Sequence, residues 1–231
     1  MRDQFAGDIT DWIKFSLLRG LAGNDRSLGI AWYYIEDVAD AEQEHLDPAV
    51  AQALAKLRER SVSALEELPI WKNNTKFFRK HVPRRQDRKR WLEEMKASLY
   101  ESQIVFFDPD NGLGKPDALH ATLEEIAAMR KPGRALVLIH FPSFAEKHDL
   151  QIASHHDALF QNAKTESLFT IKTRVTVHRQ DPYGDGMPLQ RSRWFTVIDG
   201  DDVIRKRAED FVEKFKRIKG CSASIDPENK K

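Results

Sequence analysis

The fold of this 231-residue chain is decided by the stretch Gln-Ile-Val-Phe-Phe-Asp-Pro-Asp-Asn-Gly-Leu at residues 103–113. Its apolar run predicts a strand buried on both faces, as in the middle of a parallel sheet. Pro109 lacks a backbone donor and Asn111-Gly112 favours a turn, so the strand stops there. Open α/β sheets bind ligands at the carboxyl ends of their strands. A turn whose side chains only cap backbone donors is the alternative to a functional site at Asp108, Pro109, Asp110 and Asn111.

Hydrophobic patterning outward from this stretch predicts an α/β protein. Strands are expected at 28–35, 103–107, 135–140, 167–178 and 191–198. Helices are expected at 5–22, 86–101, 117–130, 143–163 and 201–218, with scaffold helices over 40–68. Strands 103–107 and 135–140 flank a helix, so they should be parallel neighbours in a βαβ unit.

The predicted fold is one Rossmann-like domain with a mostly parallel sheet. The last two strands should form an antiparallel edge pair, which many such sheets carry. A helical, basic insertion is expected at about 40–100, and a disordered tail at 222–231 because its residues are polar.

Composition limits the function classes. Net charge is +1, so affinity for nucleic acid would have to come from local clustering. Cys221 is the single cysteine, which excludes an internal disulfide and a cysteine zinc site. No apolar run reaches the roughly 20 residues of a membrane span, and the start of the chain lacks the apolar core of a signal peptide. These features predict a cytoplasmic protein.

Residues 70–91 are rich in basic side chains interleaved with four aromatic ones. Basic groups neutralise phosphates and aromatic faces stack on unpaired bases, so this segment suits RNA or single-stranded DNA. The alternative is a solvated basic helix start whose Trp91 packs in the core. The expected substrate contacts are Lys76, Arg79, Lys80, Arg84, Arg85 and Arg88.

The first helix carries a second polar group. Apolar residues spaced by four form its buried stripe, and Asp8 is its expected N-cap. Asp11 and Lys14 fall on a neighbouring face, where they could simply form an i,i+3 ion pair. Strand 28–35 runs into Glu36 and Asp37, which would lie either beside Asp108 or in solvent.

Two motifs together resemble the bacterial large-subunit rRNA adenine-N6 methyltransferases. Residues 6–15, Ala-Gly-Asp-Ile-Thr-Asp-Trp-Ile-Lys-Phe, look like the family's Ala-Gly-Asn-x-x-Asp-x-x-Lys-His motif. The Asp-Pro-Asp-Asn turn at 108–111 resembles its Asp-Pro-Pro-Tyr motif. The order of the parts also matches the family. The pair also looks like a little-characterised bacterial family.

The resemblance implies a Rossmann-like enzyme that binds S-adenosylmethionine and methylates a base amine in nucleic acid. Asp108 would accept a hydrogen bond from the amine, with the Pro109 carbonyl beside it. The implied cofactor contacts are Lys14, Asp11, Asp8 and Glu36. The chain departs from the family in two places: no glycine-rich turn follows strand 28–35, and Asn111 replaces the tyrosine that stacks on the base.

Two other functions remain open. Asp108 and Asp110 form an Asp-x-Asp pair that could hold Mg²⁺ for phosphoryl transfer or nuclease chemistry, with Asp8, Glu36 or Asp37 as a further ligand. Haloacid dehalogenase phosphatases use a similar turn, but with a threonine where this chain has Gly112. The third function is a non-catalytic module that binds nucleic acid or a protein partner.

Overall fold

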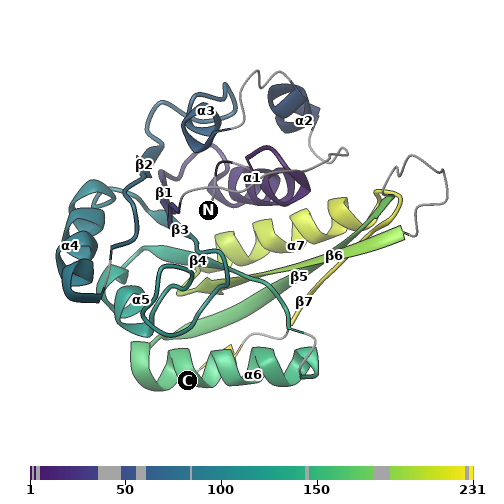
Figure 1. Ribbon diagram of the computed structural model, residues 1–231. Coiled ribbons are helices and arrows are strands. Elements are labelled where there is room, and N and C mark those ends of the chain that lie inside the picture. Colours follow the sequence, from purple (N-terminus) through teal and green to yellow (C-terminus); the bar gives the residue numbers. More distant parts are fainter. Residues whose placement is uncertain are drawn as a thin grey trace.

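The computed structural model describes residues 1, 3, 6–35, 48–55, 61–83, 85–143, 146–178, 188–226 and 229–230. Over these residues the chain forms a mixed sheet with helices on both faces (Figure 1), which confirms the predicted α/β class. None of the helices in these ranges has the length and apolarity needed to cross a membrane.

The sheet has the strand order β2-β1-β3-β4-β6-β5-β7, and β8 also pairs with β5. β2, β1, β3 and β4 are parallel, whereas β6 is antiparallel to β4 and β5 is antiparallel to β6 and β7. The strands are β1 (Leu28–Trp32), β2 (Lys76–Phe78), β3 (Ile104–Asp108), β4 (Ala135–His140), β5 (Ser167–His178), β6 (Pro188–Ile198), β7 (Cys221–Ile225) and β8 (Asn229–Lys230).

The predicted antiparallel pair at the edge of the parallel sheet is confirmed, and the structure adds a further strand outside it. β6 lies between β4 and β5, and β7 covers the outer side of β5. Residues 194–198 of β6 are all buried, as expected for a strand inside a sheet covered on both faces. The predicted disorder of the tail was wrong over residues 222–225, because Cys221, Ala223 and Ile225 alternate with serines and pack on the core.

The helices are α1 (Ile9–Ala22), α2 (Pro48–Ala55), α3 (Val62–Glu66), α4 (Arg88–Ser98), α5 (Leu123–Met129), α6 (His148–Ala158) and α7 (Asp202–Lys216). A 3-10 turn spans Arg85–Asp87, and a π-helical turn over Leu159–Ala163 extends α6. The N-cap of α5 is Thr122, whereas the sequence predicted a helix from Asp117. Thr122 and Glu125 form a capping box there. The predicted insertion at 40–100 is not purely helical, since it contains β2.

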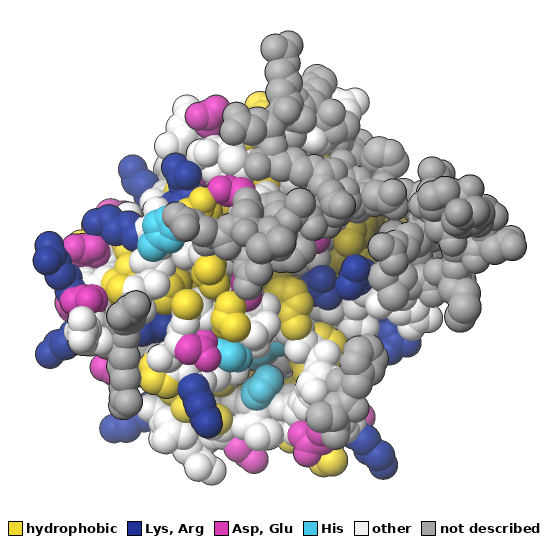
Figure 2. All heavy atoms as spheres, in the orientation of Figure 1, with side chains coloured by type: hydrophobic (Ala, Val, Ile, Leu, Met, Phe, Trp, Pro, Cys, Tyr) yellow, Lys and Arg dark blue, Asp and Glu magenta, His cyan; other side chains and the backbone are white. Residues whose placement is uncertain are grey.

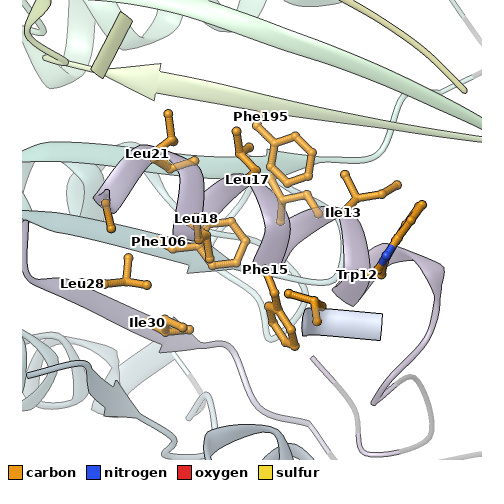
Figure 3. Close-up of a cluster of buried hydrophobic side chains, with 14 of the residues drawn as sticks. Trp12, Ile13, Phe15, Leu17, Leu18, Leu21, Leu28, Ile30, Phe106 and Phe195 are labelled. Atoms are coloured by element: carbon orange, nitrogen blue, oxygen red, sulfur yellow. The ribbon is translucent and has the colours of Figure 1, made fainter. Parts of the chain in front are cut away.

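Two apolar layers sandwich the sheet. α1, α2, α3 and α7 contribute to one layer, and α4, α5 and the π-helical turn to the other. Figure 3 shows Ile13, Leu17 and Leu18 of α1 among Phe106 of β3 and Phe195 of β6. α1 is thereby fixed across several strands, which sets the position of its polar first turn.

Candidate functional site

A cleft of about 200 Å³ lies where α1 begins and β3 and β4 end. Predicted site residues from distant parts of the sequence meet here, although neither motif alone predicts that they lie close together. They are Asp8, Asp11, Lys14, Asp108, Pro109 and Asp110. Residues that sequence reasoning missed complete the lining: Met1, Thr10, Phe141, Arg191 and Arg193.

The start of α1 is built by the Ala-Gly-Asp motif. Asp8 is the N-cap, as predicted, and its Oδ1 accepts from the backbone amides of Thr10 (2.7 Å) and Asp11 (3.1 Å). Gly7 has φ +80°, a conformation that glycine adopts without strain. Its amide donates to Asp11 Oδ2 at 2.7 Å. The motif therefore turns Asp11 inward.

Lys14 is the centre of a buried ion cluster. Its Nζ lies 3.0 Å from both carboxylate oxygens of Asp108 and 2.7 Å from Asp11 Oδ1. The three side chains are almost completely buried. The predicted Asp11–Lys14 pair thus exists, and it also joins α1 to the end of β3. The sulfur of Met1 lies 3.8 Å from the same Nζ.

Burial and charge act against each other in this cluster. Burial disfavours the ammonium of Lys14, but the carboxylates of Asp108 and Asp11 outweigh it and raise the pKa of Lys14 above its ordinary value. Burial raises the pKa of Asp11 to about 7, although Lys14 opposes the shift.

The wall formed by β6 presents a guanidinium to the cleft. Arg193 Nε donates to Thr10 Oγ1 at 3.1 Å, and its Nη1 donates to the carbonyl of Ser192 at 2.8 Å. Its Cζ lies 4.6 Å from the centre of the Phe141 ring. Burial lowers the pKa of Arg193 to about 10. The Arg-Ser-Arg alternation at 191–193 was the available signal, since a strand places residues i and i+2 on one face.

Other predicted site residues lie away from the cleft or outside the described residues. Asn111 is exposed and does not line the cleft, and its backbone amide donates to the Leu119 carbonyl. Asp110, at 15% exposure, has its Oδ1 2.8 Å from the Met1 amino group. Glu36, Asp37, Arg84 and the side chain of Arg85 lie outside the described residues.

Arg88 was predicted to contact nucleic acid, and this was wrong. Its side chain is buried and pairs with Glu125, which lies 2.5 Å from Nε and 3.1 Å from Nη2. Glu125 also accepts from the Tyr33 hydroxyl at 2.9 Å. A buried carboxylate needs a cation and donors, so Arg88 is committed to holding α4 against α5.

The rest of the basic stretch is partly neutralised. Lys80 pairs with Glu94 at 2.9 Å and Arg79 with Glu66 at 3.2 Å, whereas Lys76 is exposed. The aromatic rings of the basic stretch pack against the core, and the ring centres of Trp91 and Phe78 lie 5.4 Å apart. Figure 2 shows basic and acidic side chains mixed over the region of α4.

Among the described residues, no group of three or more His, Cys, Asp or Glu side chains is arranged to hold a metal ion. Asp108 and Asp110 were the predicted start of a metal site. The ammonium of Lys14 instead bonds both carboxylate oxygens of Asp108.

Comparison with known proteins finds no matching family model and no matching curated protein. Among solved structures, the chain is similar to the X-ray structure of precorrin 8W decarboxylase from Methanobacterium thermoautotrophicum. The TM-score is 0.38 and the identity 11%, over 81% of this chain and 89% of that one. Likeness at this level says nothing about activity, which must be argued from the cleft.

Proposed function

We propose that the cleft is the active site of an S-adenosylmethionine-dependent methyltransferase that acts on a base amine of nucleic acid. One observation carries the proposal. The two motifs behind the family resemblance are 94 residues apart at Lys14 and Asp108, yet these side chains bond each other at 3.0 Å. A resemblance made of two unrelated matches would not predict that contact.

The position of the cleft in the sheet also favours ligand binding. From β1 the chain moves outward to β2 and then returns past β1 to β3 and β4. The strand order therefore reverses between β1 and β3. In open α/β sheets, ligands bind outside the carboxyl ends of the strands at such a reversal. Asp108 ends β3, one of the two strands at the reversal, and the cleft extends from there toward β4 and β6.

The polar groups present suit part of S-adenosylmethionine, which carries an ammonium, a sulfonium and a carboxylate. Asp8 offers a carboxylate for the cationic part of the cofactor. The end of β1, where the family has its glycine-rich turn, continues into Tyr33 and Tyr34. The adenosine part of the cofactor would therefore be bound by a backbone geometry that differs from the family's glycine-rich turn.

When bound, the cofactor supplies an electrophilic methyl group. The residues of this chain hold and orient the nucleophile. Lys14 fixes Asp108, whose orientation Asp11 supports through the same ammonium. Pro109 and Asp110 line the cleft beside it, so a carbonyl and a carboxylate can accept the two hydrogens of an amine. Acceptors placed in this way localise the nitrogen lone pair and stabilise developing positive charge.

The first test is thermal unfolding with S-adenosylmethionine and S-adenosylhomocysteine, with Mg²⁺ and Mn²⁺ as separate arms. A ligand at 100 times its dissociation constant stabilises the native state by about 2.7 kcal/mol. We expect the adenosyl ligands to raise the melting temperature by several degrees. Transfer of labelled methyl groups to RNA and DNA pools is then measured with wild type, Asp110→Asn and the control Asp149→Asn.

Asp110→Asn should retain the adenosyl shift and lose about 100-fold in transfer rate, because an amide accepts less strongly. Asp149 is 88% exposed and lies away from the cleft, so its variant should behave as wild type. A shift with the metals only would favour phosphoryl chemistry on Asp108 and Asp110. Nucleic-acid binding without any adenosyl or metal shift would favour the non-catalytic module and reject methyl transfer.

A further inference from the structure

The hairpin of β5 and β6 extends past the carboxyl end of β4. β4 pairs with β6 only from Leu136↔Ile198 to His140↔Trp194, while the β5–β6 pairing continues to His178↔Pro188 (Figure 1). Residues 188–193 of β6 therefore flank the cleft beyond the core of the sheet. This strand segment was not among the substrate contacts that the sequence predicted.

Strand alternation turns two arginines of this segment toward the cleft. Phe195 and Val197 pack in the apolar layer beneath α1, so Arg191 and Arg193 share that face. Both line the cleft. Arg191 is exposed, and Arg193 is partly buried. Arg191 can therefore contact a ligand that approaches from solution, and Arg193 can bind it within the cleft.

Arg193 is held in one orientation by neighbours that carry no charge. Thr10, Ser192 and the Phe141 ring fix its guanidinium, as described above. None of the carboxylates in the described ranges lies within ion-pair distance of it, and Asp8 of the same cleft directs its Oδ1 to the first turn of α1. In contrast, Arg79, Lys80 and Arg88 all have carboxylate partners.

We propose that Arg193, with Arg191 at the mouth, is the subsite for a phosphate group of the nucleic-acid acceptor. Planar guanidinium groups bind phosphate through paired N–H donors. β6 is two strands from β3, or roughly 10 Å, a span that one nucleotide covers from base to phosphate. This proposal rests on one part of the proposed function, namely that the acceptor is a nucleic acid.

The test is calorimetric titration of the full chain with adenosine 5′-monophosphate and with adenosine, which lacks the phosphate. Wild type should bind the nucleotide at least about tenfold more tightly. In Arg193→Gln the two affinities should agree within about twofold, and Arg193→Lys should be intermediate because it keeps the charge but loses the fork. Arg174→Gln is the matched control, since Arg174 is an exposed arginine of β5 that lines a separate cavity.

The same variants are titrated with S-adenosylhomocysteine and with 5′-methylthioadenosine, which lacks the amino-acid part. If Arg193→Gln weakens the first and leaves the nucleotide preference intact, the guanidinium serves the cofactor carboxylate and the proposal is overturned. Equal binding of nucleotide and nucleoside by folded wild type, or no nucleotide binding at millimolar concentration, also overturns it. A nucleotide preference that depends on Arg193 without adenosyl binding would keep this subsite and reject methyl transfer.

Discussion

Lys14 is the residue on which the cleft depends most, because a single ammonium serves two buried carboxylates. Lys14→Met removes the cation and leaves Asp11 and Asp108 facing each other without compensation. Breaking a buried ion pair from one side typically costs 3–5 kcal/mol, so we expect a loss of about 4 kcal/mol in the free energy of unfolding. Urea denaturation measures it.

A double variant separates the ion cluster from general packing. Lys14→Met with Asp108→Asn removes one charge of each sign, so part of the lost stability should return. If the two substitutions instead add without coupling, the cluster does not exist as described. The control is Lys206→Met, which removes a solvent-exposed pair with Asp210 and should therefore leave the stability close to that of wild type.

We expect His140 to make the protein sensitive to acid. It ends β4 and stacks on His155 at 4.6 Å between ring centres, and neither of its ring nitrogens has a hydrogen-bond partner among the described residues. Burial, with a smaller effect of His155 and His156, lowers the pKa of His140 well below its ordinary value. The unfolded chain therefore takes up a proton below about pH 6.5 that the folded chain refuses, and stability falls as pH falls.

We expect His140→Phe to remove this dependence. Between pH 7 and pH 5 the wild type should lose about 2 kcal/mol more than the variant, if His140 stays neutral when folded. Unfolding free energies at several pH values test this. The raised pKa of Asp11 has the opposite effect, but it is present in both proteins and cancels in the difference. Parallel pH curves would show that His140 is protonated in the folded protein.

At the scale of elements, the turn after β3 needs a glycine for two reasons. Gly112 has φ +79°, and a Cβ there would lie 2.7 Å from His140 Nδ1 and 3.2 Å from its Cα. Gly133 has φ +74° with nothing within 4 Å, so it is the matched control. Gly133→Ala should cost about 1 kcal/mol from backbone strain alone. Gly112→Ala should cost clearly more in chemical denaturation, and equal costs would place His140 elsewhere.

The elements that could be predicted are those with strong local patterns. Apolar runs predicted five of the strands, β1, β3, β4, β5 and β6, and four-residue spacing predicted α1 and α7. β2 has only three residues, and β7 alternates serines with small apolar residues, so neither pattern stands out. Thr122 and Glu125 did carry a capping-box signal that the more obvious Asp117 obscured.

The candidate site was predictable in part for the same reason. Asp8, Asp11, Lys14 and Asp108 stand in motifs, so their chemistry was visible in the sequence. Arg193 and Phe141 stand in ordinary strand sequence, and only the pairing of β4 with β6 brings them to α1. The prediction for Arg88 was wrong for a different reason. A run of basic residues gives no sign of which of them will pair with the buried Glu125.

At the scale of the molecule, the sheet joins a parallel half that bears the cleft to an antiparallel half that supports its wall. β5 spans twelve residues, and β7 covers its outer edge from Val175↔Cys221 to Ile171↔Ile225. Without β7, the backbone groups of this edge would be open to another chain. The position of Arg193 depends on the same support, because in the described part of the chain β5 is the strand that pairs with β6 beyond the end of β4.

We therefore expect a chain ending at Lys219 to be less stable and to self-associate with rising concentration, as judged by urea unfolding and size-exclusion chromatography. A chain ending at Asp226 keeps β7 and the 2.6 Å pair of Asp226 with Lys172, so it is the control and should resemble wild type. In the shorter chain the nucleotide preference set by Arg193 should weaken, while the Lys14 cluster stays intact because its residues belong to α1 and β3. A monomeric, fully stable protein after loss of β7 would show that β5 does not need an outer partner, and that the wall of the cleft is supported from β4 alone.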